Sequence, residues 1–355
     1  MTKEPDNLKP VKRYKELDAL RGLAAILVVF FHCTMGRPAY NSFFKLGTTG
    51  VDLFFVISGF VIFMSLQKVT RGVDFVINRV SRLYPTYWAC VTFTFLTITC
   101  YSLHYNIPDY DKNVIPYLGN LTMFQLYLKL PDLDGPYWTM IIEMLFYIFM
   151  LILFEIKWLK YLKAIGIILC SSAVIYTHYF LEVGCLKGVL ELVPLVQFLP
   201  LFFAGTTFYT LYTKRDNLIF NYSIILFCFI CQILLFPYSG PAHFFISAAE
   251  YSVMLFIYFV LFILLINNRL TFIVNKATLF LGKISFALYL VHQFFSLKII
   301  IPLFCDIYGW NFWVVIVFID FPIIIGIATL ITYQIEIPYS AKMKNLLHKI
   351  FAKPS

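Results

Sequence analysis

The chain has 355 residues, of which 61% are hydrophobic and only 13% are charged, with a formal net charge of +9. A water-soluble domain carries about 25% charged residues, so this composition excludes an ordinary soluble enzyme and a disordered chain. The apolar runs are continuous over about 20 residues, as spanning helices need, whereas β-barrel strands alternate over about 10 residues. We therefore expect an all-α, polytopic integral membrane protein, with the lipid bilayer as its constant partner.

About ten spans are expected, in a single membrane domain that covers 1–355. In chain order they are 17–35, 49–67, 84–104, 136–155, 161–180, 191–212, 218–237, 242–267, 279–304 and 310–334. The polar segment 1–16 precedes the spans and the tail 335–355 follows them. The first span lacks a small-residue cleavage site, so we interpret it as a retained signal anchor. The longest loop is 105–135, and its apolar piece 118–130 is expected to lie at the interface or to re-enter the membrane.

Lysine and arginine are unequally distributed between the two sides of the predicted membrane domain. Most of the 28 basic residues fall on the same side as segment 1–16. The loops on the other side contain only Arg37, Lys45, Lys112, Lys129 and Lys187. Because cytoplasmic loops carry the excess of positive charge, both termini are predicted to be cytoplasmic. The net charge is thus mainly a topology signal, and no nucleic-acid partner is expected.

The eight cysteines indicate no metal or redox centre. Most of them lie inside the spans, and Cys228 with Cys231 forms a CxxC in mid-helix that has no second pair. Buried cysteine packs like a small apolar residue, so we expect neither a metal ion nor a disulfide framework. Cys33 follows His32 but points about 100° away from it on a helix, so we interpret it as packing and not as a nucleophile.

Four ionisable residues from four different spans are expected at a similar depth in the outer half of the membrane. They are His32, Asp52, Glu143 and His292. A charged group in hydrocarbon costs about 2.5–3.5 kcal/mol or more unless it is paired or solvated, so we expect the four to face one polar cavity. The alternative for each alone is a hydrogen bond between packed helices. Ser285, Tyr289 and His292 share one helix face. Trp138 is expected at the outer rim, where aromatic side chains anchor spans.

A second polar cluster is expected at the cytoplasmic face. Arg79 and Arg82 are three residues apart, on one face of a short helix that we expect to end before Pro85. Guanidinium groups bind phosphate oxygens through paired hydrogen bonds, so we interpret this pair as an anion site. Arg21, at the inner end of the first span, can contribute to it. The alternative explanation is ordinary positive-inside charge.

The two clusters suggest a ligand that has a phosphorylated head and a long thin arm. Coenzyme A has this shape, with a 3′-phosphate and a pyrophosphate at one end and a thioester at the other. An ion- or proton-coupled transporter would also need buried histidine and carboxylate groups. Transporters often contain inverted repeats, and no internal repeat is evident in this sequence. A scaffolding protein would leave the buried charges unexplained.

Five stretches of the sequence resemble, in the same order, the motifs of the membrane acyltransferase 3 family. They are LDALRGLAAILVVFFH, GVDLFFVISGFVI, FVINRVSRLYPTYW, PYWTMIIEMLFY and GKISFALYLVHQ. Thr139 stands where the family usually has Ser, Met140 where it has Leu and Phe286 where it has Tyr. The stretch YQIEIPYS is a degraded form of the closing Glu-Lys-Pro segment, and it carries no weight here. The similarity spans most of the chain.

The resemblance implies a transmembrane O-acyltransferase of the bacterial inner membrane. Such an enzyme moves an acetyl, or another acyl, group from cytoplasmic acyl-CoA to a hydroxyl of a surface polysaccharide such as a lipopolysaccharide O-antigen. The acceptor can be lipid-linked. By this resemblance His32 is the catalytic histidine, and Arg21, Arg79 and Arg82 bind acetyl-CoA. The chain resembles the stand-alone type of the family, without an extra soluble domain.

Catalytic roles follow from the chemistry of these side chains. The imidazole of His32 has a reference pKa of about 6.5, which suits removal of a proton from an attacking sugar hydroxyl. Asp52 or Glu143 is expected to orient the ring, as the carboxylate does in a catalytic triad, and the choice stays open. A covalent acyl-histidine is an alternative mechanism. An exporter of small acyl compounds is the alternative function.

Three further residues are expected to contact the acceptor. They are Trp138, Tyr289 and His292. For Tyr289 and His292 the alternative is simple packing between helices.

Overall fold

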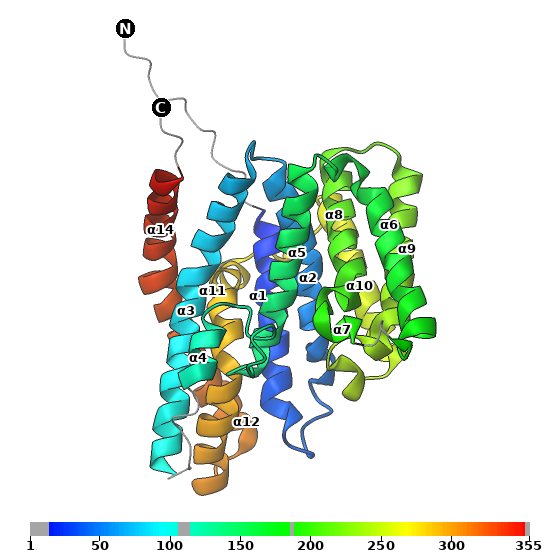
Figure 1. The fold of residues 1–355 in the computed structure, drawn as a ribbon. Helices are drawn as coiled ribbons and strands as arrows, with labels where there is room; N and C mark the ends of the chain where they lie inside the picture. Colours follow the sequence, from blue (N-terminus) through cyan, green and yellow to red (C-terminus); the bar gives the residue numbers. More distant parts are fainter. Residues whose placement is uncertain (1–13, 106–113, 185–187, 352–355) are drawn as a thin grey trace.

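The computed structural model describes residues 14–105, 114–184 and 188–351. Segment 1–13, Lys112 and Lys187, which were used to predict the topology, lie outside the described residues. Within those residues the regular structure consists of helices packed side by side in one bundle (Figure 1). The helices are α1 (Lys15–Met35), α2 (Gly50–Leu66), α3 (Gly72–His104), α4 (Val114–Asn120), α5 (Trp138–Glu155), α6 (Leu162–Ile175), α7 (Val189–Leu192), α8 (Leu199–Thr213), α9 (Leu218–Leu235), α10 (Ala248–Ile266), α11 (Lys276–Phe295), α12 (Phe312–Val315), α13 (Phe321–Ile331) and α14 (Ile337–Ile350).

Nine helical segments of the described chain are long and apolar enough to cross a membrane, which confirms the all-α, polytopic membrane class. Each overlaps one of the predicted spans. They are Lys15–Met35, Lys45–Leu66, Gly135–Glu155, Leu159–Phe180, Pro194–Thr213, Leu218–Tyr238, Ala248–Ile266, Lys276–Ile307 and Phe312–Ile350. The last is longer than predicted, because its 39 residues continue helically into the expected polar tail. That length corresponds to about 58 Å, against a hydrocarbon core of about 30 Å.

The remaining predicted span, 84–104, lies in α3, a single helix of 33 residues. The prediction that a short helix ends before Pro85 is wrong, because α3 continues through this proline. A proline is tolerated inside a membrane helix where neighbouring groups satisfy the freed backbone carbonyl. The start of α1 and the end of α14 lie toward the same end of the bundle (Figure 1). A chain whose two ends lie on the same side crosses the membrane an even number of times. The nine segments and α3 together make ten crossings.

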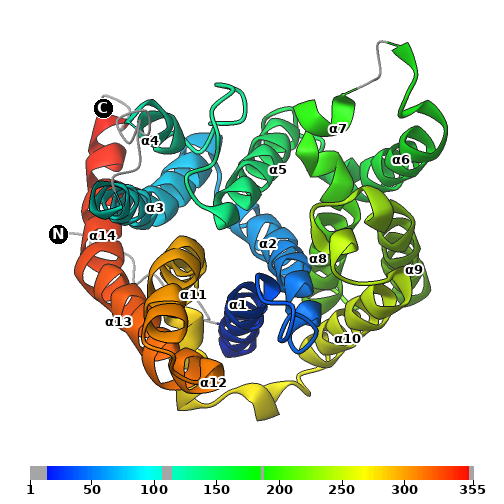
Figure 2. The same cartoon turned by 90° about the horizontal axis from the view of Figure 1, so that it is seen from below.

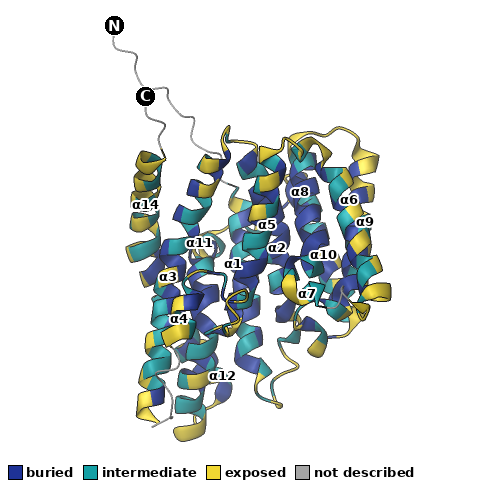
Figure 3. Ribbon diagram, in the orientation of Figure 1, coloured by how far each residue is buried: buried dark blue, intermediate teal, exposed yellow. Residues whose placement is uncertain are grey.

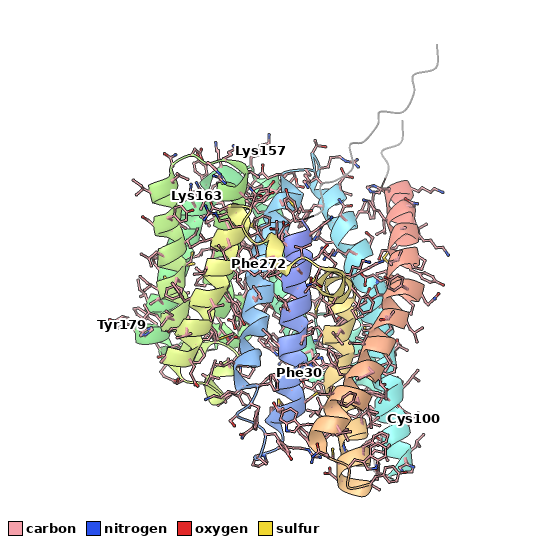
Figure 4. The ribbon with its side chains drawn as sticks, turned by 180° about the vertical axis from the view of Figure 1, so that it is seen from behind. Phe30, Cys100, Lys157, Lys163, Tyr179 and Phe272 are labelled. Atoms are coloured by element: carbon pink, nitrogen blue, oxygen red, sulfur yellow. The ribbon has the colours of Figure 1, made fainter. Side chains whose placement is uncertain are left out.

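The orientation of the bundle follows from its basic residues. Lys157 and Lys163 lie at the end of the bundle where α14 ends, and Cys100 lies toward the opposite end (Figure 4). By the positive-inside rule the lysine-rich end is cytoplasmic.

The predicted interfacial piece of the long loop packs on the side of α3. There Tyr84 and Trp88 donate hydrogen bonds to the backbone carbonyls of Thr122 and Leu121.

Close helix crossings form the core of the bundle. Viewed from the outer side, α1 lies among the other helices, with α2 and α11 beside it (Figure 2). A Cβ added at Gly22 of α1 would lie 2.7 Å from the backbone nitrogen of Gly282 in α11, and one at Gly59 of α2 would clash with the Phe202 carbonyl oxygen in α8. Small residues permit such close backbone approach. Buried residues accordingly concentrate on these inner helices (Figure 3).

Candidate active site

Two cavities adjoin each other inside the bundle. The inner cavity, of about 100 Å³, is lined by apolar and hydroxyl side chains, mainly of α2, α5 and α11, and by five charged residues: Arg21, Arg82, Glu143, Lys283 and Glu336. The outer cavity, of about 30 Å³, is lined by residues that include His32, Asp52, Trp138 and Tyr251. Val51 and Tyr289 line both cavities, so these two side chains form the partition between them.

The rings of His32 and His292 are held together by the close crossing of α1 and α11. The Nδ1 atom of His32 lies 2.9 Å from Nε2 of His292 and 3.1 Å from the backbone carbonyl oxygen of Val28. The Nδ1 atom of His292 lies 2.9 Å from the carbonyl oxygen of Tyr289. His292 is fully buried and is not among the residues that line either cavity.

These contacts determine where the protons lie on the two neutral rings. A carbonyl oxygen can only accept, so Nδ1 of His292 carries a hydrogen and donates it to Tyr289. The Nε2 atom of His292 then carries a lone pair and accepts the Nδ1 hydrogen of His32. The remaining nitrogen of His32, Nε2, is left without a hydrogen. Since His32 lines the outer cavity, its basic nitrogen is available to a group that enters there.

Asp52 lines the outer cavity as expected, but it does not contact His32. Its Oδ1 atom accepts a hydrogen bond of 2.9 Å from the hydroxyl of Tyr251 in α10. The side chain is 4% exposed, so this bond satisfies a carboxyl group that has little access to water. The geometry therefore assigns to His292 the orienting contact that was expected from Asp52 or Glu143.

Glu143 lies in the inner cavity, so the prediction of one cavity shared by four ionisable residues is wrong. Its Oε1 atom accepts hydrogen bonds from Ser58, at 2.7 Å, and from Tyr147. Trp138 lines the outer cavity, and Glu143 follows it by five residues on α5, which is about 7.5 Å along the helix. This rise carries the carboxylate past the partition, to the side of Arg21 and Arg82.

The three arginines expected to bind the donor separate into two environments. Arg21 and Arg82 line the inner cavity. Arg79 is not among its lining residues: its guanidinium donates a hydrogen bond of 3.2 Å to the hydroxyl of Ser65 and lies over the ring of Phe75. Residues three apart on a helix are offset by about 60°, which is enough for one to reach the cavity and the other to pack behind it.

The aromatic residues expected to contact the acceptor lie at the outer cavity and its partition. Trp138 lines the outer cavity, and its ring centroid is 5.8 Å from that of Phe198. The hydroxyl of Tyr289 donates to Oγ1 of Thr139 at 3.1 Å, and the ring of Phe54 packs edge-on against Tyr289. These contacts hold the Tyr289 ring across the boundary between the cavities.

Sequence reasoning missed two acidic residues. Glu336 lies in the degraded closing motif, yet it lines the inner cavity with Arg21 and Arg82. Asp320 is fully buried in the last span, where it accepts a hydrogen bond of 3.4 Å from the thiol of Cys33. An ionisable residue inside an apolar span is itself a signal of function, and Asp320 carried that signal. Among the described residues, no three or more histidine, cysteine, aspartate or glutamate side chains form a group that could hold a metal ion.

Three curated proteins illustrate what the chain is similar to. "Putative acetyltransferase ORF330" of Acidianus two-tailed virus is 26% identical over 285 residues, which cover 77% of this chain and 80% of that protein. "Putative membrane-bound transacylase BcsY" of Komagataeibacter xylinus is 33% identical over 117 residues, or 32% of this chain and 28% of that protein. "Exopolysaccharide production protein ExoZ" of Rhizobium meliloti is 44% identical over 46 residues, or 13% of this chain and 14% of that protein. No solved structure matches the chain.

The match to a protein family is much more extensive. Residues 14–333 match the acyltransferase 3 family, which is described as an acyltransferase domain. This range contains α1 to α13 and includes both histidines and all three arginines discussed above. The chain therefore belongs to the acyltransferase 3 family and is a multi-pass membrane acyltransferase.

Proposed function

We propose that the protein transfers an acetyl group from cytoplasmic acetyl-CoA to a hydroxyl of a cell-surface polysaccharide sugar, such as one of a lipopolysaccharide O-antigen, on the periplasmic side of the inner membrane. The observation that carries this proposal is the pair of adjoining cavities. Arginines line the inner one, and the basic nitrogen of His32 is available in the outer one.

The donor is proposed to enter from the cytoplasmic end. Arg21 and Arg82 offer forked donors that match phosphate oxygens, and the bundle places both in the inner cavity. The arm of the donor then extends along α2 and α11 to the partition at Val51 and Tyr289. A thioester at this point lies at the boundary of the outer cavity. In this arrangement the acyl group reaches the outer side while it is still attached to the donor.

The acceptor is proposed to approach from the outer face. The outer cavity takes the attacking hydroxyl beside His32, and the ring of the sugar packs against the aromatic side chains Trp138 and Phe198, which line the same cavity. The name of ExoZ, a relative over a short stretch, refers to exopolysaccharide production, which supports a polysaccharide acceptor.

In the proposed reaction His32 acts as general base and then as general acid. Its Nε2 atom takes the proton of the acceptor hydroxyl while the hydroxyl oxygen forms a bond to the thioester carbonyl carbon. The tetrahedral intermediate then loses the sulfur by cleavage of the carbon–sulfur bond. The thiolate takes the proton from Nε2 of His32, so the products are an acetyl ester and CoA with a free thiol. The Nδ1 hydrogen of His32 stays with His292 and the Val28 carbonyl oxygen, so Nε2 is the atom that takes up the proton and returns it.

The test is acetylation of surface glycan in cells that lack the gene and carry it again on a plasmid. Mass spectrometry of the isolated polysaccharide should show a gain of acetyl groups with the wild-type gene and none with His32→Gln at equal membrane abundance. In proteoliposomes, acetyl-CoA supplied on the cytoplasmic side should be consumed only when acceptor is present on the other side. Unchanged glycans in all strains would contradict the proposed acceptor.

A further inference from the structure

A third cavity, which we call the lysine vestibule, opens at the cytoplasmic end of α1 and α11. Its volume is about 340 Å³. Three lysines, two aromatic residues and one leucine line it: Lys15, Lys276, Leu279, Phe280, Lys283 and Tyr333. None of these six side chains is a carboxylate, so the walls of the vestibule carry only positive charge. A cavity of this composition attracts an anion.

The vestibule is built by the helix period of α11. Lys276, Leu279, Phe280 and Lys283 occupy positions i, i+3, i+4 and i+7, which lie on one face of a helix. Lys15 at the start of α1 and Tyr333 of the π-helical segment Thr332–Glu336 complete the walls. The ammonium of Lys283 lies 4.0 Å from the centroid of the Tyr333 ring, a cation–π contact that holds the side chain at this position.

Lys283 joins the vestibule to the donor site, because it also lines the inner cavity that contains Arg21 and Arg82. The close approach of Gly22 to Gly282 brings Arg21 and Lys283 to the same crossing of α1 and α11. A molecule that occupies the inner cavity can therefore extend into the vestibule. The two sites together present a continuous series of cations from the cytoplasmic end toward the partition.

Topology charge accounts for only part of this arrangement. Lys15 and Lys276 stand at the first residues of their helices, where the positive-inside rule expects them. Lys283 is seven residues, or about 10 Å, further along α11. Moreover, α1 and α11 begin deeper in the bundle than the cytoplasmic ends of α3 and α14 (Figures 1 and 4). Lys283 contacts the Tyr333 ring, and none of the six described side chains that line the vestibule is acidic, so its positive charge is left for a ligand to balance.

We propose that the lysine vestibule binds a phosphomonoester, namely the terminal phosphate at the nucleotide end of the acyl donor. Phe280 and Tyr333, which are 37% and 43% exposed, offer flat surfaces for the purine base. This inference rests on the proposed function, since the donor is acetyl-CoA there. Its consequence is donor selection: acyl donors that lack the terminal phosphate bind less tightly. An anionic lipid with a phosphomonoester head group is the other source of the same chemistry.

The experiment compares two donors on the purified full-length protein. Isothermal titration in detergent measures the affinity for acetyl-CoA and for acetyl-dephospho-CoA, which differ only in the 3′-phosphate. We expect wild type to prefer acetyl-CoA about tenfold. The double variant Lys15→Gln/Lys276→Gln should lose this preference: its affinity for acetyl-CoA should fall about tenfold, and its affinity for acetyl-dephospho-CoA should stay unchanged. In Lys283→Gln the affinity for acetyl-CoA should also fall. Lys344→Gln, an exposed lysine of α14 outside the vestibule, is the charge-matched control and should behave as wild type.

The outcomes distinguish this inference from the proposed function. If wild type binds both donors equally, or if the double variant keeps the full preference, the vestibule does not bind the terminal phosphate and the inference is overturned, while the donor assignment stands. If wild type binds neither donor, the proposed donor is wrong. Native mass spectrometry with phosphatidic acid and phosphatidylcholine then tests whether the vestibule binds a lipid phosphate. If wild type retains phosphatidic acid better than the double variant does, the vestibule is a phosphomonoester site for a lipid. If both proteins retain the two lipids equally, the phosphomonoester site is overturned.

Discussion

Nδ1 of His32 lies 2.9 Å from Nε2 of His292. The carbonyl oxygen of Tyr289 accepts from Nδ1 of His292, so the hydrogen of the His292 ring is on the nitrogen that does not contact His32. In the proposed mechanism a neutral imidazole takes the place that a carboxylate has in a catalytic triad. Together with the Val28 carbonyl oxygen it accepts the Nδ1 hydrogen of His32, without placing a negative charge in a part of the membrane domain where ionised groups are costly. Asp52 accepts instead from Tyr251, and Glu143 accepts from Ser58 and Tyr147.

The first prediction concerns His32 as general base. Substitution His32→Gln should reduce acyl transfer by about 10²–10⁴-fold, the usual contribution of a positioned base. Transfer is measured as release of free CoA from acetyl-CoA in the presence of acceptor. Affinity for acetyl-CoA should stay unchanged, because His32 does not line the inner cavity. A variant that is folded by gel filtration and keeps most of its activity would show that the base is elsewhere.

The second prediction separates an orienting role of His292 from packing. His292→Phe fills a similar volume but leaves Nδ1 of His32 with the Val28 carbonyl oxygen as its one acceptor, so kcat should fall by about 2- to 13-fold with little change in KM. His292→Gln keeps a carbonyl oxygen that can accept the same hydrogen, and it should recover part of the loss. Equal kcat for both variants would argue that His292 only fills space. The pH profile of kcat should change with Phe and be closer to wild type with Gln.

The third prediction ranks the two arginines of α3. Arg82→Lys should weaken binding of acetyl-CoA about tenfold, because lysine keeps the charge and loses the fork, and Arg82→Ala should weaken it by about 10- to 150-fold. Arg79→Lys should have a smaller effect on affinity, since this guanidinium bonds to Ser65 and packs on Phe75 outside the cavity. Titration calorimetry of both variants gives the ranking. The reverse order would place the phosphates on the other face of α3.

The fourth prediction tests the orientation of the bundle. Ser42→Cys lies in the exposed loop after α1, and Asp216→Cys lies in the exposed connection between α8 and α9. A membrane-impermeant maleimide added to spheroplasts should label the cysteine at position 42 and leave the one at position 216 unlabelled until the membrane is opened. The wild-type protein, which keeps its native cysteines, provides the background. Reversed labelling would put Arg21 and Arg82 on the side without CoA.

The fifth prediction concerns the pH dependence of stability at the outer loop. Asp134 is 5% exposed and accepts hydrogen bonds from the backbone nitrogens of Gly135, at 2.8 Å, and Phe294, at 3.1 Å. Burial raises its pKa to about 7, although these hydrogen bonds act in the opposite direction. The folded state therefore holds a proton that the unfolded chain has lost above about pH 4. This contribution to stability is complete below about pH 4 and is lost as the pH rises through 7.

Asp134→Asn removes this titration and keeps an oxygen that can accept from Gly135. The apparent melting temperature of the purified protein should fall between pH 5 and pH 8 for wild type, and it should fall less for the variant. Asp216→Asn, an exposed carboxylate of the α8–α9 connection, serves as the control. A variant whose pH dependence equals that of wild type would exclude Asp134 as the titrating group.

The sequence was sufficient to predict the membrane class and the approximate spans, because these depend on local properties. Hydropathy over about 20 residues identifies a spanning helix, and the helix period fixes which side chains share a face. His32, Arg21 and Arg82 were singled out as ionisable residues in or beside apolar spans and by the family resemblance, and all three line the adjoining cavities. The boundary at Pro85 was wrong because the surroundings of a proline decide whether a membrane helix continues through it.

Only the tertiary structure decided which of these side chains meet. Glu143 and Asp52 were expected beside His32 from their depth alone, whereas the partner of His32 proved to be His292. Depth along a helix does not fix the direction in which a side chain points across the bundle. That direction depends on the rotation, tilt and spacing of the neighbouring helices. The crossing of α1 and α11 at Gly22 and Gly282 fixes these for the histidine pair, because two glycines permit a closer backbone approach than any residue with a side chain.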